Sequence, residues 1–426
     1  MTSRMIRKDE SKLFVLVSSI IVVIFVIFAV IFFKKDEKKI EKPVVKTMVK
    51  SGTNPVLIKL DAGSMPEFSD DLALKNLENV INQSLKYLKK IPENRIFTFG
   101  KDKYPTTHMI LSLKRFLEFI KKKPSTGEID QFIRTNYIVY KSKGRDDKGT
   151  VLFTGYFEPL LFGSLKKSEK YRFPVYGRPD DLTVLDLSLF SKKYKGKKIT
   201  GRVKGKTFVP YHDRKEIDHD RVLDKKADIL AWVDDPIDIF FLHIQGSGKI
   251  ALDSGKTINI QYNSQNGRPY MSIGKLLIDT KKIGRAEMSM QKIREYLNAN
   301  PDQMQKVFNY NPSYIFFWIK DDGPYGAINV RLTQERSIAI DRKIFPSAAL
   351  SFIDAEKPVI DKNGNIVEWK KFSRFVSSQD TGGAIKGPGR VDLFWGAGDY
   401  ARIAAGHMKH YGSLYFFILK QDKAGN

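Results

Sequence analysis

Residues 378–396 read SQDTGGAIKGPGRVDLFWG, and this stretch carries most of the information about the fold and its chemistry. Two carboxylates, Asp380 and Asp392, stand on either side of a glycine-rich turn. Glycine reaches backbone conformations that other residues avoid, so the chain can double back here and bring the two acids close together. Aspartates also cap ordinary turns, and spacing alone leaves that structural role open.

Asp392 is followed directly by apolar and aromatic residues, Leu393, Phe394 and Trp395. Against such a surface a carboxyl loses solvation and its pKa rises, as does the pKa of one of two neighbouring acids. A carboxyl that keeps its proton at neutral pH can protonate the leaving oxygen of a glycosidic bond. Acid catalysis of glycan cleavage is therefore one role open to this segment, beside the capping of turns.

Other kinds of active site fit the sequence poorly. Asp380, Thr381 and Gly382 match the motif of aspartic peptidases, but polar residues precede it and the chain has no second copy. His212 and His219 lie in a charged segment without the spacing of a metal-binding pair. The chain has no cysteine, which excludes disulfides, thiolate metal sites and a cysteine nucleophile. No metal site and no cofactor are predicted.

The pattern of the chain changes near residue 150. Before it, apolar residues at three- and four-residue spacing predict helices at about 72–95 and 108–123. Further helices are expected at 288–300 and 398–412. Short β-rich runs separated by glycine, proline and short polar residues are found at 149–164, 171–178, 205–212, 238–252, 257–262, 312–320 and 413–420. The predicted fold class is mainly β with accessory helices, built as barrel-like β structure without alternating βαβ units.

Aromatic and amide side chains gather in this β region. Flat aromatic faces can stack on sugar rings, and planar amides can bind hydroxyl and acetamido groups. Packing between strands is the alternative role for each of these residues. Together they predict an elongated polar groove, with the substrate-binding candidates Tyr156, Glu158, Gln245, Ser247, Tyr262, Asn266 and Tyr270.

The chain is strongly basic, with 73 Lys and Arg against 48 Asp and Glu and a net charge of +25. Such a charge favours a polyanionic partner. Nucleic acid is not expected, because the basic residues are spread along the chain and no nucleic-acid-binding motif is present.

Residues 13–33, LFVLVSSIIVVIFVIFAVIFF, form a run of 21 residues without a charge. As a helix this run would be about 31 Å long at ~1.5 Å per residue, which matches the hydrocarbon core of a bilayer. We expect a basic N-terminal tail over 1–12, an uncleaved transmembrane anchor over 13–33 and a basic linker over 34–55. The lysines after the anchor do not favour export of the C-terminal part, but the functional evidence outweighs them.

Taken together, these motifs resemble the membrane-bound lytic murein transglycosylase A family from about residue 150 to 419. The resemblance is carried by segments that include FTGYFEP (153–159), FPVYGRPDDL (173–182), NGRPYMSIGKLLID (266–279) and QDTGGAIKGPGRVDLFWGAGDYARIAAG (379–406). It implies a double-psi β-barrel domain, here 56–156 plus 312–426, interrupted by an inserted β-rich domain over 157–311. Peptidoglycan glycan strands are expected to bind in the groove between the two domains.

The resemblance also implies roles for three aspartates. It makes Asp392 the catalytic acid, Asp380 the neighbour that adjusts its pKa, and Asp341 a structural support of the barrel. The residues expected to line the groove near the cleaved bond are Thr154, Gly155 and Tyr156. Members of the family often begin with a lipid-modified cysteine, which this chain lacks, and segment 344–350 has no glycine where one is usual.

The implied reaction is cleavage of the β-1,4 bond between N-acetylmuramic acid and N-acetylglucosamine without water, which leaves 1,6-anhydro ends. In this reaction Asp392 serves first as an acid and then as a base. A glycan hydrolase in which Asp380 positions water, and a non-catalytic wall-binding module, are the alternatives. We expect a monomer in the cell envelope, anchored to a membrane, with the catalytic part in the periplasm.

Overall fold

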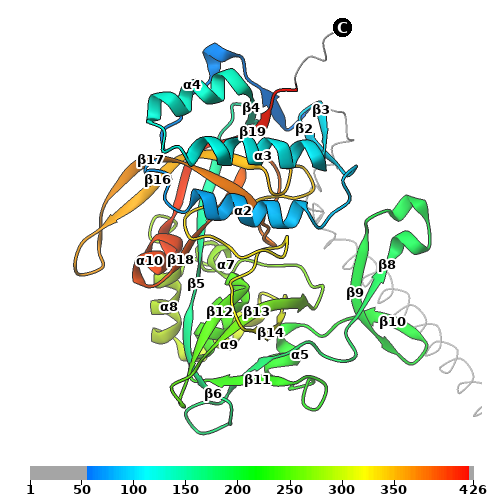
Figure 1. Ribbon diagram of the computed structural model, residues 1–426. Helices are drawn as coiled ribbons and strands as arrows, with labels where there is room; N and C mark the ends of the chain where they lie inside the picture. The colour runs from blue at the N-terminus through cyan, green and yellow to red at the C-terminus, as the bar shows by residue number, and fades with distance from the viewer. Residues whose placement is uncertain (1–54, 422–426) are drawn as a thin grey trace, which may run out of the picture. The chain divides into compact units, whose positions relative to one another are not determined.

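The computed structural model describes residues 55–421 (Figure 1), and within them six strands close into a barrel. In order around the barrel these strands are β5 (Val151–Glu158), β18 (Arg390–Ala397), β15 (Ser337–Ala339), β17 (Ile366–Asp380), β16 (Leu350–Ile360) and β19 (Lys409–Leu419). Strand β19 pairs with β5 and so completes the ring. Two neighbouring pairs, β18–β5 and β15–β17, are parallel.

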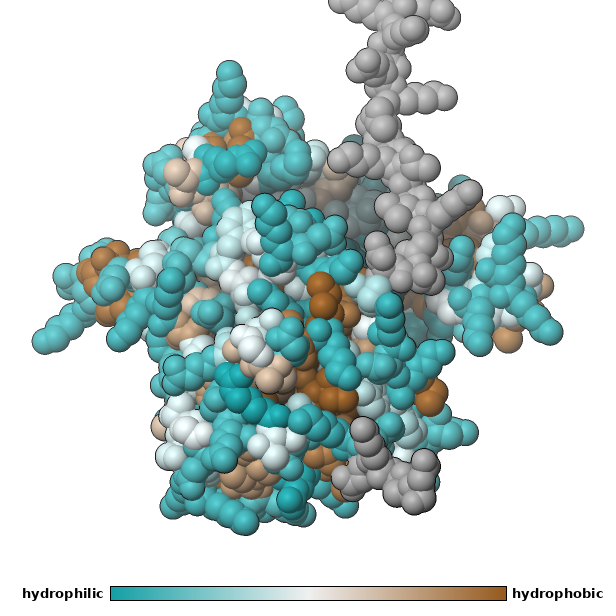
Figure 2. Space-filling model, turned by 90° about the horizontal axis from the view of Figure 1, so that it is seen from above, coloured by the Kyte–Doolittle hydropathy of each residue, from teal (hydrophilic) through white to brown (hydrophobic). Residues whose placement is uncertain are grey.

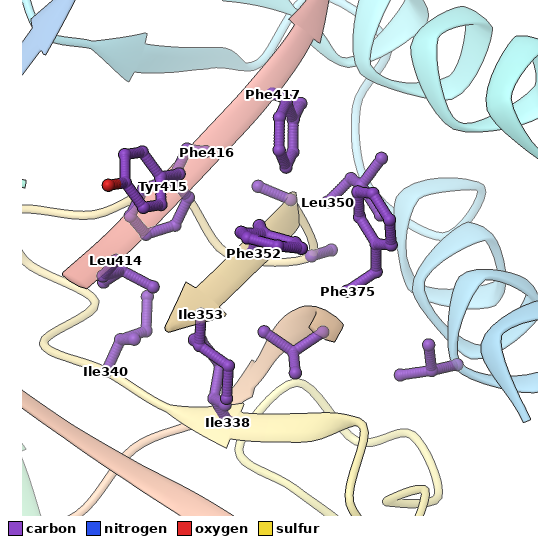
Figure 3. Close-up of a cluster of buried hydrophobic side chains, with 14 of the residues drawn as sticks. Ile338, Ile340, Leu350, Phe352, Ile353, Phe375, Leu414, Tyr415, Phe416 and Phe417 are labelled. Carbon is purple, nitrogen blue, oxygen red and sulfur yellow. The ribbon is translucent and has the colours of Figure 1, made fainter. Parts of the chain in front are cut away.

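The barrel is filled by apolar side chains from every side. Phe352 and Phe375 meet edge to face at 5.0 Å between ring centroids. Figure 3 shows them within a cluster to which β15, β16, β17 and β19 all contribute. Side chains alternate between the two faces of a strand, so Val391, Leu393 and Trp395 of β18 enter this core and are fully buried. The same alternation turns Asp392 to the opposite face of the strand.

From residue 55 onward, three α-helices precede the barrel strands: α2 (Leu77–Leu88), α3 (Thr106–Ile120) and α4 (Thr126–Asn136). The first two confirm the helices predicted near 72–95 and 108–123, and α4 was not predicted. Strands β1 (Leu57–Lys59) and β4 (Tyr137–Ser142) extend the barrel sheet from β19, beside the hairpin β2 (Ile96–Phe99) and β3 (Asp102–Pro105). The side-chain amide of Gln379, next to Asp380, donates to the carbonyl of Val80 at 2.8 Å and so ties α2 to the end of β17.

The chain between β5 and β15 forms a second sheet. Its strands, in spatial order, are β14 (Ile315–Lys320), β13 (Thr257–Gln265), β12 (Ser247–Leu252), β6 (Leu160–Ser164), β11 (Ile229–Val233) and β7 (Phe173–Tyr176). A separate small sheet consists of β8 (Thr183–Asp186), β9 (Lys198–Lys204) and β10 (Thr207–Pro210). Because β14 pairs with β13, it belongs to the inserted sheet, although the boundary predicted at residue 312 assigned it to the barrel domain.

The same part of the chain contains five α-helices: α5 (Arg214–Asp218), α6 (Pro236–Gln245), α7 (Ile273–Asp279), α8 (Met290–Ala299) and α9 (Pro301–Asn309). Helix α8 confirms the prediction for 288–300, and α10 (Asp399–His407) confirms the short helix before the last strand. The prediction of a β-rich run over 238–252 was wrong for its first half, which is α6. Asp235 caps that helix by accepting from the Ile237 backbone N–H, and Gly246 ends it in the left-handed conformation.

The fold class predicted from the sequence, mainly β with accessory helices around a barrel, is confirmed. No helix between residues 55 and 421 has both the length and the apolar character needed to cross a bilayer. The predicted anchor at 13–33 and the basic segment before it lie outside the described residues, as does nearly all of the predicted linker.

Candidate active site

The two candidate acids and their neighbours form a row across four barrel strands. Asp392 on β18 is in register with Thr154 on β5 and, on its other side, with Ala339 on β15. Ala339 is in turn paired with Asp380 at the end of β17. Residues in register on neighbouring strands point to the same face of a sheet, so the fold brings the two aspartates to one side of the barrel wall.

Asp392 lies in a small apolar environment but keeps part of its surface exposed. Beside it lies a cluster of buried apolar side chains, one of which, Ala339, is in register with Asp392. The cluster consists of Tyr156, Leu332, Ala339, Ile385 and Phe394. The Thr154 hydroxyl donates to one carboxylate oxygen of Asp392 at 2.7 Å. The pKa of Asp392 is raised to about 6: burial and, to a smaller extent, the negative charge of Asp380 raise it, and the Thr154 hydrogen bond and the Arg390 charge lower it. The carboxyl can therefore both hold and release a proton near neutral pH.

Asp380 is held by three hydrogen-bond donors. The Tyr156 hydroxyl donates to one carboxylate oxygen at 2.8 Å, and the backbone N–H groups of Ala327 and Thr381 donate to the other at 2.9 and 2.8 Å. Burial raises the pKa of Asp380, and these donors oppose that effect. Both oxygens are thus already engaged by the protein, which fixes the negative charge in place beside Asp392.

Asp341 joins two loops near the acids. One of its carboxylate oxygens accepts from the backbone N–H of Gly387 at 2.9 Å, and the other accepts from the backbone N–H of Lys343 at 3.1 Å. Gly387 has φ = 77°, a conformation that other residues rarely adopt. The buried carboxylate of Asp341 therefore fastens the glycine-rich turn that leads into β18, which is an arrangement suited to a supporting role.

The residues of the Thr154–Tyr156 segment divide between the two faces of β5. Thr154 and Tyr156 face the aspartates. Gly155 faces the other way, and a Cβ at this position would lie 2.5 Å from Nε1 of Trp395 and 2.9 Å from Cα of Ala405. Gly155 thus permits close packing behind the site, while its two neighbours contact the acids.

Tyr270 brings the inserted domain to the site. Burial raises its pKa, and the charges of both Arg390 and Asp392 act on it. It also lies beside the glycine-rich turn, since a Cβ at Gly383 would be 3.9 Å from Cβ of Tyr270. With 37% of its surface exposed, its ring is available to a ligand bound next to Asp392.

Two further candidates lie where β5 leaves the barrel. The backbone N–H of Phe157 donates to the side-chain oxygen of Gln245 at 3.0 Å. Glu158 is buried and forms an ion pair with Lys249 at 3.3 Å, and burial raises its pKa. These contacts attach the end of β5 to α6 and β12, so both side chains hold the barrel to the second sheet.

The remaining candidates differ in how much of each side chain is free. Ser247 is buried, whereas Tyr262 is 46% exposed. Asn266 is fully buried, and both groups of its amide are used within the chain. Its nitrogen donates to the carbonyls of His212 and Pro312, and its oxygen accepts from the backbone N–H groups of Arg268 and Tyr314. Because such an amide has two donors and two acceptor sites, Asn266 has none left for a ligand.

Comparison with known proteins places the chain in a family. Residues 152–318 match the MltA specific insert domain and residues 336–418 match the 3D domain. The membrane-bound lytic murein transglycosylase A of Escherichia coli strain K12 is 32% identical over 291 residues, which is 67% of this chain and 70% of that protein. The chain belongs to the membrane-bound lytic murein transglycosylase A family. The resemblance stated from the sequence is therefore confirmed.

Solved structures of this family share the fold. The membrane-bound lytic murein transglycosylase from Agrobacterium tumefaciens matches with a TM-score of 0.69 and 26% identity, over 85% of this chain and 97% of that one. MltA from Neisseria gonorrhoeae matches with a TM-score of 0.65 and 31% identity, over 86% and 93% of the two chains. Membership of the family makes the chain an enzyme of the lytic transglycosylase class, as predicted.

Sequence reasoning missed one charged residue beside Asp392, namely Arg390. Arg390 stands two positions before Asp392 on the same face of β18 and donates to the Thr154 hydroxyl at 3.5 Å. Strand alternation could have indicated it. The backbone donor of Ala327 has no signal in the sequence, because it comes from a loop. Within the described part of the chain, no cluster of three or more histidine and carboxylate side chains could hold a metal ion.

Proposed function

We propose that this chain cuts the β-1,4 bond between N-acetylmuramic acid and N-acetylglucosamine in peptidoglycan without water and leaves 1,6-anhydro ends. The observation that carries the proposal is the Asp392 carboxyl, which is half-buried among apolar side chains with its pKa raised to about 6. Its family supports the substrate class, since the curated relatives are named lytic murein transglycosylases.

Asp392 acts twice in this reaction. In its protonated form it donates to the oxygen that links the two sugars, the bond from C1 to that oxygen breaks, and an oxocarbenium-like sugar forms. The Asp392 carboxylate then takes the proton from the C6 hydroxyl of the same sugar. The C6 oxygen then bonds to C1, which closes the 1,6-anhydro ring. A pKa near 6 suits both steps, because neither form of the carboxyl is strongly favoured over the other near neutral pH.

The alternative of a glycan hydrolase requires a second carboxylate that activates water. Asp380 is the available candidate, but its two oxygens already accept three hydrogen bonds from Tyr156, Ala327 and Thr381. A carboxylate held in this way is a poor base for water. It serves instead as a fixed negative charge that raises the pKa of Asp392.

The glycan occupies the face that carries the two acids, with Tyr270 of the inserted domain beside the cleaved bond. Tyr262 is the second exposed aromatic candidate for a sugar contact. Thr154 and Tyr156 bind and orient the acids from the barrel side, and Asp341 supports the turn before β18. The barrel with its two parallel strand pairs is of the double-psi type. The chain works as a monomer in the periplasm, tethered through residues 13–33.

Digestion of purified sacculi by the full chain tests this function. The wild type is expected to release anhydro-muropeptides, identified by mass spectrometry, and Asp392→Asn is expected to lower their rate of release by about 10²–10⁴-fold, the usual contribution of a general acid. Asp399→Asn is the matched control, because this carboxylate on α10 is 90% exposed and outside the site. It is expected to cut at the wild-type rate.

Each other outcome separates the competing functions. Products with reducing ends in place of anhydro ends would establish a hydrolase. A wild type that binds sacculi without releasing any product would establish a wall-binding module. Unchanged anhydro products from Asp392→Asn would remove Asp392 from the mechanism.

A further inference from the structure

The small sheet β8–β10 carries an unusually basic segment. Residues 187–206, here called the basic patch, contain eight lysines and arginines and no aspartate or glutamate. They cover the connection from β8 to β9, the whole of β9 and the turn that follows it. Most of the basic residues lie elsewhere in the chain, where acidic residues are interspersed with them, so the patch stands out as a stretch with a single sign of charge.

The basic patch also exposes large apolar side chains. Every residue from 189 to 199 is exposed, and Leu189 and Phe190 reach 86% and 72% exposure at the end of a short 3₁₀ helix. No apolar side chain between 183 and 210 is buried. A three-stranded sheet normally needs a covered hydrophobic face to be stable, so this sheet presents a face that the described residues leave open.

The lysines of the patch are free to meet an external anion. Lys198 pairs with Asp186 at 3.6 Å. Between residues 55 and 421 no carboxylate pairs with the other lysines of the connection, Lys192, Lys193, Lys195 and Lys197. In Figure 1 the sheet stands at the right, apart from the barrel sheet and the six-stranded sheet, and in Figure 2 the lobe at the right shows brown residues among long hydrophilic side chains.

Lysines that surround exposed aliphatic and aromatic side chains are typical of surfaces that lie at the boundary between lipid headgroups and acyl chains. Anionic headgroups attract the lysines, and the apolar side chains gain by leaving water. An anionic wall polymer would account for the lysines but not for Leu189 and Phe190, which would remain in water. The names of the curated relatives, "membrane-bound", and the run at 13–33 are consistent with a membrane close by.

We infer that the basic patch docks on the anionic phospholipid surface of a membrane, with Leu189 and Phe190 inserted at the acyl boundary and the neighbouring lysines on the headgroups. The contact is independent of the chemistry at Asp392. It would fix the orientation of the folded part above the bilayer.

The absence of cysteine makes a direct test possible. In the full chain, Phe190→Cys provides a single attachment point for an environment-sensitive fluorophore. Val367→Cys is the matched control, because it is also highly exposed, at 63%, and lies on the β16–β17 hairpin at the opposite side of Figure 1. Each labelled protein is incorporated into vesicles of phosphatidylcholine alone or of phosphatidylcholine with phosphatidylglycerol.

The label at 190 is expected to shift to the blue and to be quenched by a lipid-phase quencher only in the vesicles that contain phosphatidylglycerol. The shift should be lost in high salt, which screens the lysines, and after Lys192→Glu, Lys193→Glu, Lys195→Glu and Lys197→Glu are combined. The label at 367 should show the emission of a water-exposed fluorophore in both kinds of vesicle and should not be quenched from the lipid phase. A label at 190 that stays in water in both vesicles overturns the inference. So does a label that responds to soluble peptidoglycan fragments without lipid, since the partner would then be the wall.

Discussion

At the scale of single residues, the pKa of Asp392 is the result of opposing influences. Burial raises it, the Thr154 hydroxyl and the Arg390 charge lower it, and Asp380 raises it again. Apart from burial, each influence comes from a single side chain that can be replaced without touching the carboxyl itself. The position of the pH profile therefore reports the environment of the acid separately from the rate.

Thr154→Val is predicted to move the descending limb of the profile of kcat/KM against pH to higher pH. The reaction starts from protonated Asp392, so kcat/KM falls as pH rises through the pKa near 6. The Thr154 hydroxyl stabilises the carboxylate, and its loss raises that pKa by roughly 1 unit, the equivalent of one charged hydrogen bond. Thr154→Ser, which keeps the hydroxyl, should leave the limb in place. A limb that does not move in Thr154→Val would mean that another group limits the rate.

The same carboxyl is predicted to make folding depend on pH. Its pKa is about 6 in the folded chain against an ordinary 3.8, so the folded state binds this proton more tightly than the unfolded state does. Stability from this group is fully present below about pH 4 and is lost as pH rises through about 6. An asparagine side chain has no ionisable group, so Asp392→Asn does not lose stability as pH rises. At pH 8 the free energy of unfolding of the variant should exceed that of the wild type by at most about 3 kcal/mol.

Urea unfolding of both proteins at pH 4 and pH 8 checks this prediction. The difference in the free energy of unfolding between Asp392→Asn and the wild type should be larger at pH 8 than at pH 4. An equal difference at the two pH values would show that the carboxyl is not desolvated by folding.

At the scale of elements, close packing behind β5 determines how Thr154 and Tyr156 are presented. Gly155→Ala would place a methyl group 2.5 Å from the Trp395 ring and 2.9 Å from the backbone of α10. Something must shift, so we predict a loss of about 1–3 kcal/mol in stability together with a lower kcat. Gly127→Ala is the control: nothing lies within 4 Å of its Cβ in helix α4, and it should gain about 0.5–1 kcal/mol.

A buried ion pair fastens the segment before α2 to the barrel. Arg336 is fully buried and meets Asp70 through two hydrogen bonds of 2.6 and 2.9 Å. Asp70→Ala leaves the guanidinium without its partner, and should cost about 3–5 kcal/mol in denaturant unfolding. The double variant Asp70→Ala with Arg336→Met should recover part of that loss. Glu78→Gln, which breaks an exposed pair with Lys121, should cost less than about 1 kcal/mol.

An exposed face made some elements predictable from the sequence, but not all of them: α4, with buried residues only at Ile129 and Ile133, was not predicted. Helix α8 has buried residues only at Ile293 and Leu297, so its helical period is visible. Helix α6 is buried on almost every side at Ile237 and from Ile239 to His243, and the period disappears in a continuous apolar run. The cap at Asp235 and the glycine at 246 were the signals that identify α6 as a helix.

At the scale of the whole molecule, the site is assembled from segments far apart in the sequence. The resemblance and the glycine-rich turn identified Asp380, Asp392 and the Thr154 segment, but spacing along the chain cannot show that four strands align them in one row. That alignment depends on the parallel pairing of β5 with β18, a contact between residues more than 200 positions apart. The backbone N–H of Ala327, which donates to Asp380, could not be predicted either, because it comes from a loop that only the folded chain brings to the site.

The contact between the barrel and the inserted domain yields the last prediction. The Phe157 N–H donates to the Gln245 side chain at 3.0 Å where β5 leaves the barrel. Gln245→Leu leaves this half-buried donor without its partner, at a cost of about 1–3 kcal/mol. The domain that carries Tyr270 is then held less firmly against Asp392. We expect KM for glycan strands to rise several-fold, while the descending pH limb stays near its wild-type position because the groups around Asp392 are intact.

Gln245→Glu keeps an acceptor oxygen for Phe157 and should retain a KM close to that of the wild type. Gln291→Ala serves as the matched control at the same domain junction, because its hydrogen bond to the Arg402 carbonyl is exposed and contributes little. If Gln245→Leu moved the pH limb without changing KM, the Gln245 contact would act on the acid itself. The two domains would then be held together by their other contacts, such as the ion pair of Glu158 with Lys249.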